Sequence, residues 1–600
     1  MDTWAEQMNS SRKDPYLIFD IDDSLTRAVL IEKTNGEYKI LGMEQAPTTI
    51  DPPTLDVTIG VEKTAKGLGR KTGRSLWEAA GPSKAYQVLC SSNTGGGLYM
   101  MVAGVIGIIS AESAQRAALG AGALLIDVFS KTDPRPDFEM IEKMRSLKPD
   151  MFLLAGGTDG GAVEQVLDMT TLISTADVKP RFGSEFKLPL IFAGNIEARE
   201  KVSNVLSKEK YGIRTVDNVR PVIERENLGP AKEAIYDSFR QHVIIHSPGY
   251  DKLVKWLDQT IVPTQAAIGN ILYAYALEKQ VNLLAVDVGG ATTDVYSVYN
   301  GNFNRSLNAD VGLTYGVSNV MKMTGIQNIM RWIPKEMTER EARNIIGNLM
   351  VLQPSSLTHD ETLVQEAAAR EAIRLAVENH KGMASRLKGV RITRTVADIF
   401  GQSLEPTYLN MLKTQLVIGR GRIFTQDQTG EATILLLDAL QPEGVTEMMI
   451  DRLDIMPHLG MLLKTNPDAA KQILTKECLY RLGTCLAPKG RSRQGEMAMM
   501  VQVTKTDGTV TENEVRFGEL KTIALGNGET AQVSVTPRRG LDIGEGRGKK
   551  LETSVIGGEL GLILDARGRP LNVPTQKDVL VEWAKSLTHE HESPVASRVM

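Results

Sequence analysis

The sequence predicts an α/β protein made of two similar halves, followed by a domain of antiparallel strands. Strand and helix patterns alternate along residues 86–278, which favours a largely parallel sheet. A motif of acid, turn and hydroxyl residues occurs at Asp20 and again at Asp287, and a glycine turn follows 136 and 132 residues later. After residue 496, apolar and polar residues alternate between turn signals, as in an antiparallel sheet.

The first half begins with the hairpin pattern YLIFDIDDSLTRAVLIE at residues 16–32. Two apolar runs flank a turn, Asp20 ends the first run, and Ser24 and Thr26 provide hydroxyl groups. A carboxylate at Asp22 would repel a phosphate unless a metal ion or an arginine compensates its charge. Two interpretations stay open: the acidic pair in this turn provides additional metal ligands, or the turn is a degenerate binding site.

The remainder of the first half is expected to alternate between strands and helices. Residues 33–75 are predicted to hold short strands and a solvated basic loop, EKTAKGLGRKTGRS, because charge runs usually face solvent. A glycine turn joins two strands within residues 86–106, and Ser110 is expected to cap the next helix. Further strands are predicted at residues 123–130, 150–161 and 188–195, and helices at residues 110–122, 137–148, 162–173, 196–207, 229–258 and 263–278.

The second half is organised around VNLLAVDVGGATTDVYSVYNG at residues 281–301, where two apolar runs flank a Gly-Gly turn. Glycines let the backbone approach a ligand, consecutive N–H groups in such a turn can bind an anion, and an aspartate at a strand end suits Mg²⁺. The pattern therefore indicates a metal-nucleotide phosphate loop, with an ordinary polar hairpin as the alternative. Its candidate residues are Asp287, Gly289, Gly290, Thr292, Thr293 and Asp294.

A glycine turn in QLVIGRGRIF closes the second half at Gly419 and Gly421, as Gly156-Gly157 closes the first. The turn also contains Arg420 and Arg422. An arginine here could stack on a base, reach a phosphate, or mark a closed nucleotide pocket, and the sequence does not choose among these.

Several segments surround these motifs. The stretch at residues 303–325, which contains Asp310, Gly312 and Gly316, is predicted to be a loop leading into a helix. Residues 337–385 are strongly helical and are predicted to be an insertion. Helices are also predicted at residues 439–463 and 467–482, a linker at 488–496, and a surface hairpin at 541–552.

Composition excludes some classes of function. The formal net charge of −4 gives no field that would attract nucleic acid or an anionic membrane. Three cysteines without metal-ligand spacing suit a reducing compartment. The N-terminus lacks an apolar signal core, and the longest apolar run, residues 98–111, is shorter than the roughly 20 residues that span a bilayer. We therefore expect a cytoplasmic protein without nucleic-acid or membrane partners.

The motif at residues 281–301 resembles the second phosphate loop of the actin-like ATPase superfamily, which includes actin, sugar kinases and heat-shock chaperone ATPases. The segment from Asp20 resembles the first loop, whose usual form is acid-x-Gly-x-Thr-x-x-basic, but Asp22 replaces the glycine, Ser24 the threonine, and Arg27 the usual lysine. The resemblance implies two RNase H-like halves around a central cleft that binds ATP and Mg²⁺. It implies metal contacts from Asp20 and Asp287, phosphate contacts from Ser24, Thr26, Gly289, Gly290, Thr292 and Thr293, adenosine contacts from Gly419 and Gly421, and an attacking water oriented by Asp294.

Motifs along residues 15–580 resemble one family in particular, the MutL family associated with glutamate mutase, which is unrelated to the mismatch-repair protein of that name. The matching motifs, in order, are AAGPSKAYQVLCSSNTGGGLYMMVAGVI, AESAQRAALGAGA, FLLAGGTDGG, LIFAGNIEARE, LLAVDVGGATTDVYS and LLLDALQPEGVTE. The resemblance implies an accessory protein that acts as chaperone or reactivator for a cobalamin-dependent carbon-skeleton mutase. Departures at Asp22, Arg27, Arg420 and Arg422 bear on whether ATP is hydrolysed.

The sequence thus predicts a first half at residues 15–258, a second half at 259–487 with its helical insertion at 337–385, and a β domain at 497–580. The leading functional hypothesis is an accessory ATPase that binds Mg·ATP and a mutase partner. The alternatives are a small-molecule kinase on the same fold, which needs a general base that the sequence does not designate, and a scaffold with a degenerate nucleotide site.

Overall fold

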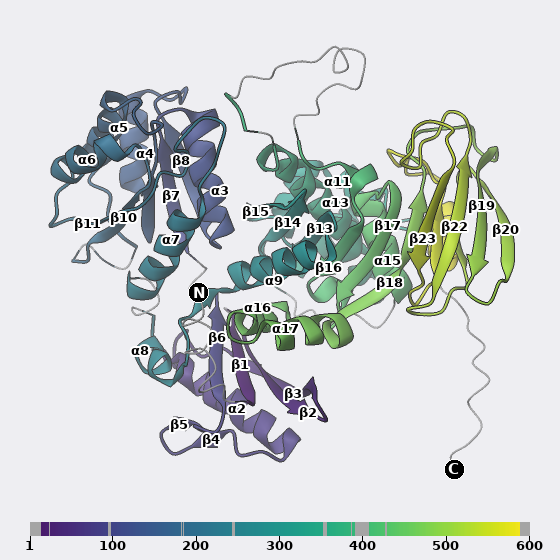
Figure 1. The fold of residues 1–600 in the computed structure, drawn as a ribbon, viewed down its shortest axis with the longest axis horizontal. Coiled ribbons are helices and arrows are strands. Elements are labelled where there is room, and N and C mark those ends of the chain that lie inside the picture. The colour runs from purple at the N-terminus through teal and green to yellow at the C-terminus, as the bar shows by residue number, and fades with distance from the viewer. Residues whose placement is uncertain are drawn as a thin grey trace, which may run out of the picture. The chain divides into compact units, whose positions relative to one another are not determined.

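The structure is a computed structural model, and it describes residues 14–22, 24–93, 98–181, 183, 185–242, 247–351, 357–385, 387–389, 407–425 and 429–587 (Figure 1). The chain forms two compact units. Unit 1 comprises residues 1–275, 386–406 and 455–478, and unit 2 comprises residues 276–385, 407–454 and 479–600. This division into units does not test the domain boundaries predicted from the sequence, which remain predictions.

Unit 1 contains a five-stranded sheet in the order β12-β6-β1-β2-β3. Strands β1, β2 and β3 form an antiparallel meander, while β6 runs parallel to β1 and β12 parallel to β6. The strands are β1 (Tyr16–Ile21), β2 (Leu25–Thr34), β3 (Glu37–Pro47), β6 (Gln87–Ser92) and β12 (Val262–Pro263). The predicted first hairpin is confirmed.

The basic stretch after β3 is a helix, α2 (Val57–Thr72), so the prediction of a solvated loop was wrong. Asp56 caps its N-terminus by accepting a hydrogen bond from the Thr58 N–H at 3.0 Å. Apolar residues recur every three to four positions and pack into the core of the sheet: Val57, Val61, Ala65 and Leu68. The charges occupy the opposite face of the helix, which is why they read as a solvated run.

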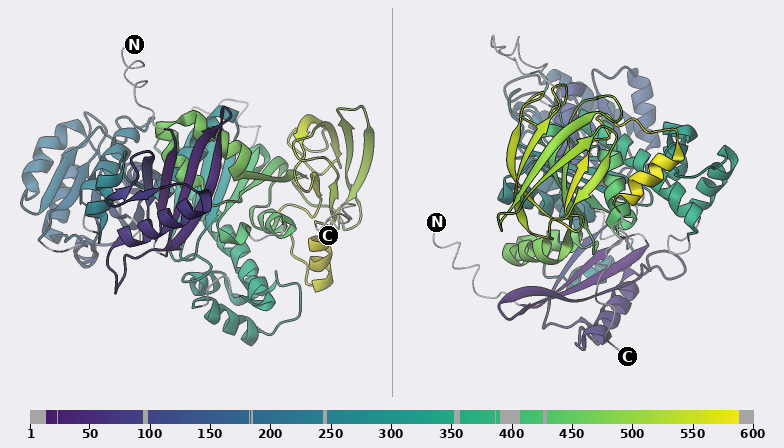
Figure 2. Two further views of the ribbon diagram at one scale, coloured as in Figure 1. Left: turned by 90° about the horizontal axis from the view of Figure 1, so that it is seen from below. Right: turned by 90° about the vertical axis from the view of Figure 1, so that its right-hand side faces the viewer.

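Unit 1 also holds an all-parallel sheet in the order β11-β10-β9-β7-β8, inserted in the sequence between β6 and β12. Helices α3 and α7 pack on one face, and α4, α5 and α6 on the other (Figure 2). The strands are β7 (Tyr99–Gly104), β8 (Leu124–Ser130), β9 (Met151–Leu154), β10 (Leu188–Phe192) and β11 (Tyr211–Thr215). The helices are α3 (Glu112–Gly120), α4 (Asp137–Ser146), α5 (Glu164–Ala176), α6 (Arg199–Val205) and α7 (Gly229–His242).

This insertion confirms the predicted alternation but corrects the predicted repeat. Gly156 follows β9 in the inserted sheet, whereas Asp20 lies on β1 in the other sheet of unit 1. The strand next to β1 is β6, so the counterpart of β16 in the first sheet is β6 and not β9. The predicted repeat was wrong at this point because the two glycine turns were matched by their distance in the sequence, and that distance includes the inserted sheet.

Unit 2 is built on an eight-stranded sheet in the order β15-β14-β13-β16-β17-β18-β24-β21. Its first five strands repeat the order and directions of the first sheet of unit 1: a three-stranded meander followed by two parallel strands. These are β13 (Leu283–Val288), β14 (Thr293–Tyr299), β15 (Asn302–Asn308), β16 (Leu416–Arg420) and β17 (Gly444–Asp451). The predicted α/β fold of two similar halves is confirmed.

Two segments predicted to be continuous helices each contain part of a strand. Within residues 439–463, α15 (Thr429–Leu440) ends, β17 follows, and only α16 (Met456–Thr465) is helical. Within residues 467–482, α17 (Pro467–Ile473) gives way to β18 (Leu479–Ala487). Leu and Met in short apolar runs fit a helix or a buried strand equally well, and pairing with β16 and β18 decides the outcome for β17.

The helical segments of unit 2 agree better with the sequence. α12 and α13 are helices within the segment predicted to be helical, and both begin with a Thr capping box. Helix α13 packs against the core under β13 and β14. The helices are α9 (Thr264–Lys279), whose first part belongs to unit 1, α10 (Val317–Thr324), α11 (Ile326–Met330), α12 (Glu339–Leu349) and α13 (His359–Met383).

The predicted C-terminal β domain is confirmed as an antiparallel sheet in the order β20-β19-β22-β23. The same part of the chain also contributes two strands to the large sheet, because β24 pairs with β18 and β21 pairs with β24 at its edge. The elements are β19 (Met497–Lys505), β20 (Val510–Arg516), β21 (Leu520–Ile523), β22 (Thr530–Pro537), β23 (Leu551–Ile556), β24 (Leu562–Asp565) and α18 (Lys577–Lys585).

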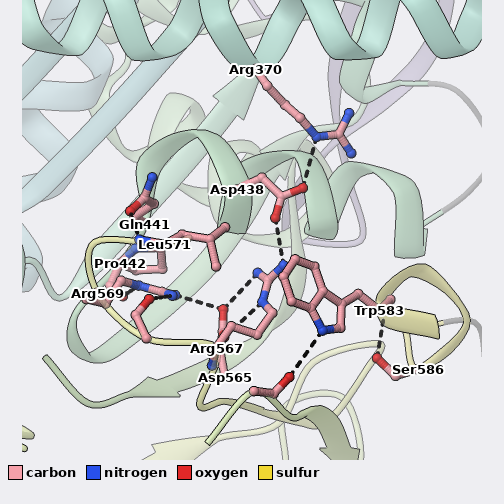
Figure 3. A network of polar contacts seen from close by, with 12 residues as sticks. Arg370, Asp438, Gln441, Pro442, Asp565, Arg567, Arg569, Leu571, Trp583 and Ser586 are labelled. Carbon is pink, nitrogen blue, oxygen red and sulfur yellow. Dashed lines mark hydrogen bonds and ion pairs between the residues drawn. The ribbon is translucent and has the colours of Figure 1, made fainter. Parts of the chain in front are cut away.

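A buried ion-pair network fixes this junction (Figure 3). Arg567 donates to Asp438 on α15 at 2.7 Å and to Asp565 at 2.9 Å, and its guanidinium lies 4.7 Å from the Trp583 ring on α18. Arg370 on α13 donates to the other oxygen of Asp438 at 2.9 Å. The network therefore joins α13, α15 and α18 to the end of β24.

Candidate functional site

The Gly-Gly turn between β13 and β14 has an exposed tip at Gly290 and Ala291. It is closed by a hydrogen bond from the Gly289 N–H to the Thr292 carbonyl at 2.9 Å. The loop from Asp310 to Gly316 packs directly on this turn, since a Cβ atom at Gly312 would lie 2.4 Å from the Gly290 carbonyl oxygen. The loop then enters α10, as predicted, and supports the turn with hydrogen bonds to its carbonyl groups.

The two threonines of this motif are placed differently. Thr293 is fully buried and its hydroxyl donates to the Val311 carbonyl at 2.7 Å, which fastens the supporting loop. Thr292 is half-buried beside the exposed tip. Of the two hydroxyls, the one on Thr292 is better placed for a ligand.

Asp287 is held by an arginine from the neighbouring strand. Arg420 is its register partner on β16 and donates to Asp287 Oδ2 at 2.5 Å. The same guanidinium lies 2.6 Å from Asp454 Oδ1 through Nη2 and 3.6 Å from Asp451 Oδ2 through Nε. Of the roles left open for Arg420, the structure thus shows a different one: it neutralises the acid of the motif.

Asp294 lies opposite Asp287 on β14 and is buried. Arg305 on β15 donates to Asp294 Oδ1 through Nε at 2.8 Å and lies 2.6 Å from it through Nη2. Burial raises the pKa of Asp294, and Arg305 opposes that rise. Burial also raises the pKa of Asp287 to about 6, with further upward effects from Asp294 and Asp454 and an opposing effect from Arg420. Four carboxylates and two guanidiniums are therefore packed together behind the turn.

The glycine turn after β16 needs its glycine for a clear reason. Gly421 has φ +109°, and a Cβ atom there would lie 2.2 Å from the Val288 carbonyl oxygen at the end of β13. Gly419 is buried, and a Cβ atom there would contact Phe424 and Leu436 at 3.2 Å. The turn therefore lies against the last residue of β13, next to the phosphate-loop candidate, while Arg422 is exposed.

The first hairpin holds its acid in another way. Asp20 is buried, and its Oδ1 accepts hydrogen bonds from the Ser91 hydroxyl on β6 at 2.7 Å and the Thr264 hydroxyl at 2.8 Å. Its register partner on β2 is Arg27. Asp20 and Asp287 are each the fifth residue of a six-residue strand, so the two acids are equivalent by position.

The hydroxyls of the first hairpin are only partly accessible. Thr48 donates to the Asp22 carbonyl at 2.7 Å, so the buried Thr26 hydroxyl donates to Thr48 in the 3.0 Å contact between them. Ser24 is exposed in the turn. Asp23 lies outside the described residues. The roles predicted for Ser24 and Thr26 remain predictions.

The two acids differ in how well they suit Mg²⁺, which prefers oxygen ligands. Asp20 accepts hydrogen bonds from two neutral hydroxyls, those of Ser91 and Thr264. Asp287 already pairs with a guanidinium. Across the described part of the chain, no three His, Cys, Asp or Glu side chains converge into a metal site, so a metal ion here would keep several water ligands.

No sequence motif singled out Asp451, Asp454 or Arg305. Asp451 and Asp454 lie in a segment predicted to be helical, where acids are common on the solvent face. Their role depends on β17 running parallel beside β16, which only the sheet order reveals. Arg305 was within a predicted loop, and its pairing with Asp294 requires the third strand of the meander.

Comparisons with known proteins agree with the architecture. A model of the family described as MutL protein matches residues 16–478. Protein MutL of Clostridium tetanomorphum is 26% identical over 491 residues, which cover 77% of this chain and 99% of that protein. None of the helices in the described ranges is long and apolar enough to cross a bilayer.

Solved structures show weaker similarity. A nucleotide-free acetone carboxylase aligns with a TM-score of 0.32 and 12% identity, covering 84% of this chain and 80% of that chain. A glycerol dehydratase reactivase aligns at 0.27 and 10% identity, covering 75% and 100%. Component A of (R)-2-hydroxyglutaryl-CoA dehydratase from Acidaminococcus fermentans aligns at 0.25 and 8% identity, covering 76% and 98%.

The family model covers more than three quarters of the sequence, from β1 to the end of the segment before β18, and so includes both acid hairpins. The chain belongs to the MutL protein family, and not to the mismatch-repair proteins of the same name.

Proposed function

We propose that this protein is an ATP-binding accessory protein that reactivates a cobalamin-dependent carbon-skeleton mutase. The observation that carries the nucleotide part of the proposal is the repeated sheet. Each half places an aspartate at the fifth residue of its first strand, directly before a hairpin turn. Family membership supports the accessory role.

The proposed nucleotide contacts are assigned according to which residues of the two hairpins and of the β16 turn are exposed and which are buried. The tip at Gly289 and Gly290, with Thr292, would bind phosphate oxygens through backbone N–H groups and a hydroxyl. Ser24 would contact phosphate from the first hairpin, while Gly419 and Gly421 would shape the adenosine end through the close packing of their turn against Phe424 and the end of β13. Thr26 and Thr293 would support their turns from within, because both hydroxyls are engaged.

Mg²⁺, when bound, would neutralise phosphate charge. Asp20 fits this ion through water ligands, because it is a carboxylate at a strand end and two of its contacts are neutral hydroxyls. Asp287 would contribute only when Arg420 withdraws from it. Asp294 would orient an attacking water only if its pair with Arg305 opened, so any ATP hydrolysis would be slow compared with binding.

A direct test is reactivation of a cobalamin-dependent mutase that has been inactivated by turnover. The full chain with Mg·ATP should restore activity, and Asp20→Asn should restore less because it weakens metal and nucleotide binding. Gly347→Ala, in an exposed position of α12, serves as the matched control. Reactivation that needs no nucleotide, or that Asp20→Asn leaves unchanged, would contradict the proposal.

The ion pair between Asp287 and Arg420 favours one alternative, a scaffold that binds its partner without nucleotide. That protein would capture the mutase equally well with and without ATP. The same reactivation assay separates the two, because a scaffold would show no dependence on ATP.

A further inference from the structure

Arg420 joins the acid of the phosphate-loop motif to the end of β17. Its Nη1 pairs with Asp287 on β13, and its Nη2 pairs with Asp454, three residues beyond the end of β17. Its Nε lies 3.6 Å from Asp451, the last residue of that strand. The Arg420 side chain is only 10% exposed, so these ion pairs are weakly screened by solvent.

Asp454 stands at a special place in the chain. It is the last residue of unit 2 before the chain enters unit 1 at Ile455. Its φ is +56°, a left-handed conformation that aspartate adopts at a cost. A conformation of this kind persists when its surroundings hold it, and the ion pair with Arg420 is a contact that does so.

We propose that Arg420 couples the occupancy of Asp287 to the crossover at Asp454–Ile455. A cation that takes Asp287 Oδ2 competes with the guanidinium for the same oxygen. When Arg420 is displaced, Asp454 loses this ion pair and the crossover loosens. This inference rests on the proposed function for the identity of the competing ligand, Mg·ATP, but the anchoring of Asp454 by Arg420 stands apart from it.

Coupling of this kind is reciprocal, because the two equilibria share one side chain. Binding of a cation at Asp287 releases the crossover, and a change that releases the crossover frees Asp287 for a cation. Arg420 and the three acids around it together carry a formal charge of −2, and this negative charge attracts a cation to the site. The acid of the phosphate-loop motif and the end of unit 2 at Asp454 are thereby linked through one side chain.

The test is amide hydrogen exchange at residues 452–456 in the full chain. Without ligand, Arg420→Ala and Asp454→Asn should speed exchange there by about tenfold or more, as expected when a local closed state loses its anchor. Arg422→Ala removes an exposed arginine two residues away and should leave exchange as in the wild type. Arg420→Lys, which keeps the charge, should give an intermediate rate and serves if Arg420→Ala does not fold.

A second arm adds Mn²⁺ alone, and then Mg²⁺ with ATP, to the wild type and to Asp287→Asn. Each should speed exchange at residues 452–456 in the wild type and not in Asp287→Asn. Unchanged exchange in folded Arg420→Ala would overturn the proposal, as would equal acceleration in Asp287→Asn. If ATP with Mg²⁺ does not change exchange at residues 452–456 while Arg420→Ala still speeds it, the proposed function is contradicted and the anchoring of Asp454 by Arg420 is supported.

Discussion

The two acid hairpins occupy the same place in two sheets of the same strand order, yet they neutralise their aspartates differently. Asp20 accepts hydrogen bonds from two hydroxyls and faces Arg27 across the hairpin. Asp287 faces Asp294 and pairs with Arg420 from the next strand. A duplicated scaffold has therefore kept the position of the acid and changed the chemistry around it.

The difference assigns different tasks to the two hairpins. A carboxylate that accepts hydrogen bonds from hydroxyls can keep them while it contacts a cation, whereas a carboxylate paired with a buried guanidinium must first lose that guanidinium. The first hairpin is thus the better candidate for a standing metal contact, and the second is the better candidate for a contact that changes with ligand binding.

The largest effect is expected when Arg420 is replaced by methionine. The variant leaves Asp287, Asp451 and Asp454 without their shared guanidinium, and breaking a buried pair costs about 3–5 kcal/mol. Denaturant unfolding at neutral pH measures the loss. A loss below about 1 kcal/mol would mean that the acids tolerate each other without Arg420, and the contrast between the hairpins would collapse.

Gly421→Ala should cost nearly as much. Its φ of +109° and the Val288 carbonyl 2.2 Å from the added Cβ force the β16 turn away from β13. The strain alone is worth about 1–3 kcal/mol, and the displaced turn adds to it. Gly347→Ala, whose Cβ would meet nothing within 4 Å, should instead stabilise by about 0.5 kcal/mol. The pair of thermal midpoints should therefore shift in opposite directions.

Glu366 is a buried acid whose nearby arginine compensates its charge less well than Arg420 compensates that of Asp287. Arg370 lies 3.8 Å away and is engaged with Asp438, and burial raises the pKa of Glu366 from 4.5 to about 7. As pH rises from 4.5 to 7, the unfolded state ionises first, so the folded state loses stability over this range.

Glu366→Gln removes that loss. The variant should match the wild type near pH 4.5 and exceed its stability above pH 7, by on the order of 1–3 kcal/mol. Unfolding measured at both pH values checks the sign. A variant that is less stable than the wild type at high pH would show that the ionised carboxylate is favourably paired.

The smallest effect is expected for Ser91→Ala. It removes one of two hydroxyl donors to Asp20 and leaves the Thr264 hydroxyl in place, at a cost of about 1 kcal/mol. Thermal unfolding would detect the change. A cost close to that of Arg420→Met would mean that Asp20 depends on its hydroxyls as strongly as Asp287 depends on its cation.

The sequence predicted the hairpins well because their signals are local. Apolar runs around an acidic or Gly-Gly turn define β1–β2 and β13–β14 without reference to distant residues. The capped helices of the insertion were predicted for the same reason. Local pattern also misled in places: the basic residues of α2 concealed its apolar face, and β17 and β18 have compositions that suit a helix.

The partners of the acids could not be predicted, because they come from other strands. Arg420 was noted only as an unusual residue in a glycine turn, and its pairing with Asp287 depends on the parallel register of β13 and β16. The position of Asp454 depends on where the chain leaves β17, three residues earlier. Likewise, the Ser91 and Thr264 hydroxyls approach Asp20 from β6 and α9. Sheet order, which the sequence does not state, decides the electrostatics of both hairpins.

The most direct measurement is calorimetric titration of the full chain with ATP, with and without Mg²⁺, for the wild type, Asp20→Asn and Asp287→Asn. We expect the wild type to bind ATP more tightly with Mg²⁺, and Asp20→Asn to lose most of this enhancement, while Asp287→Asn loses less. Absence of binding heat in the wild type, or two variants indistinguishable from it, would contradict the assignment of the two hairpins to a nucleotide site.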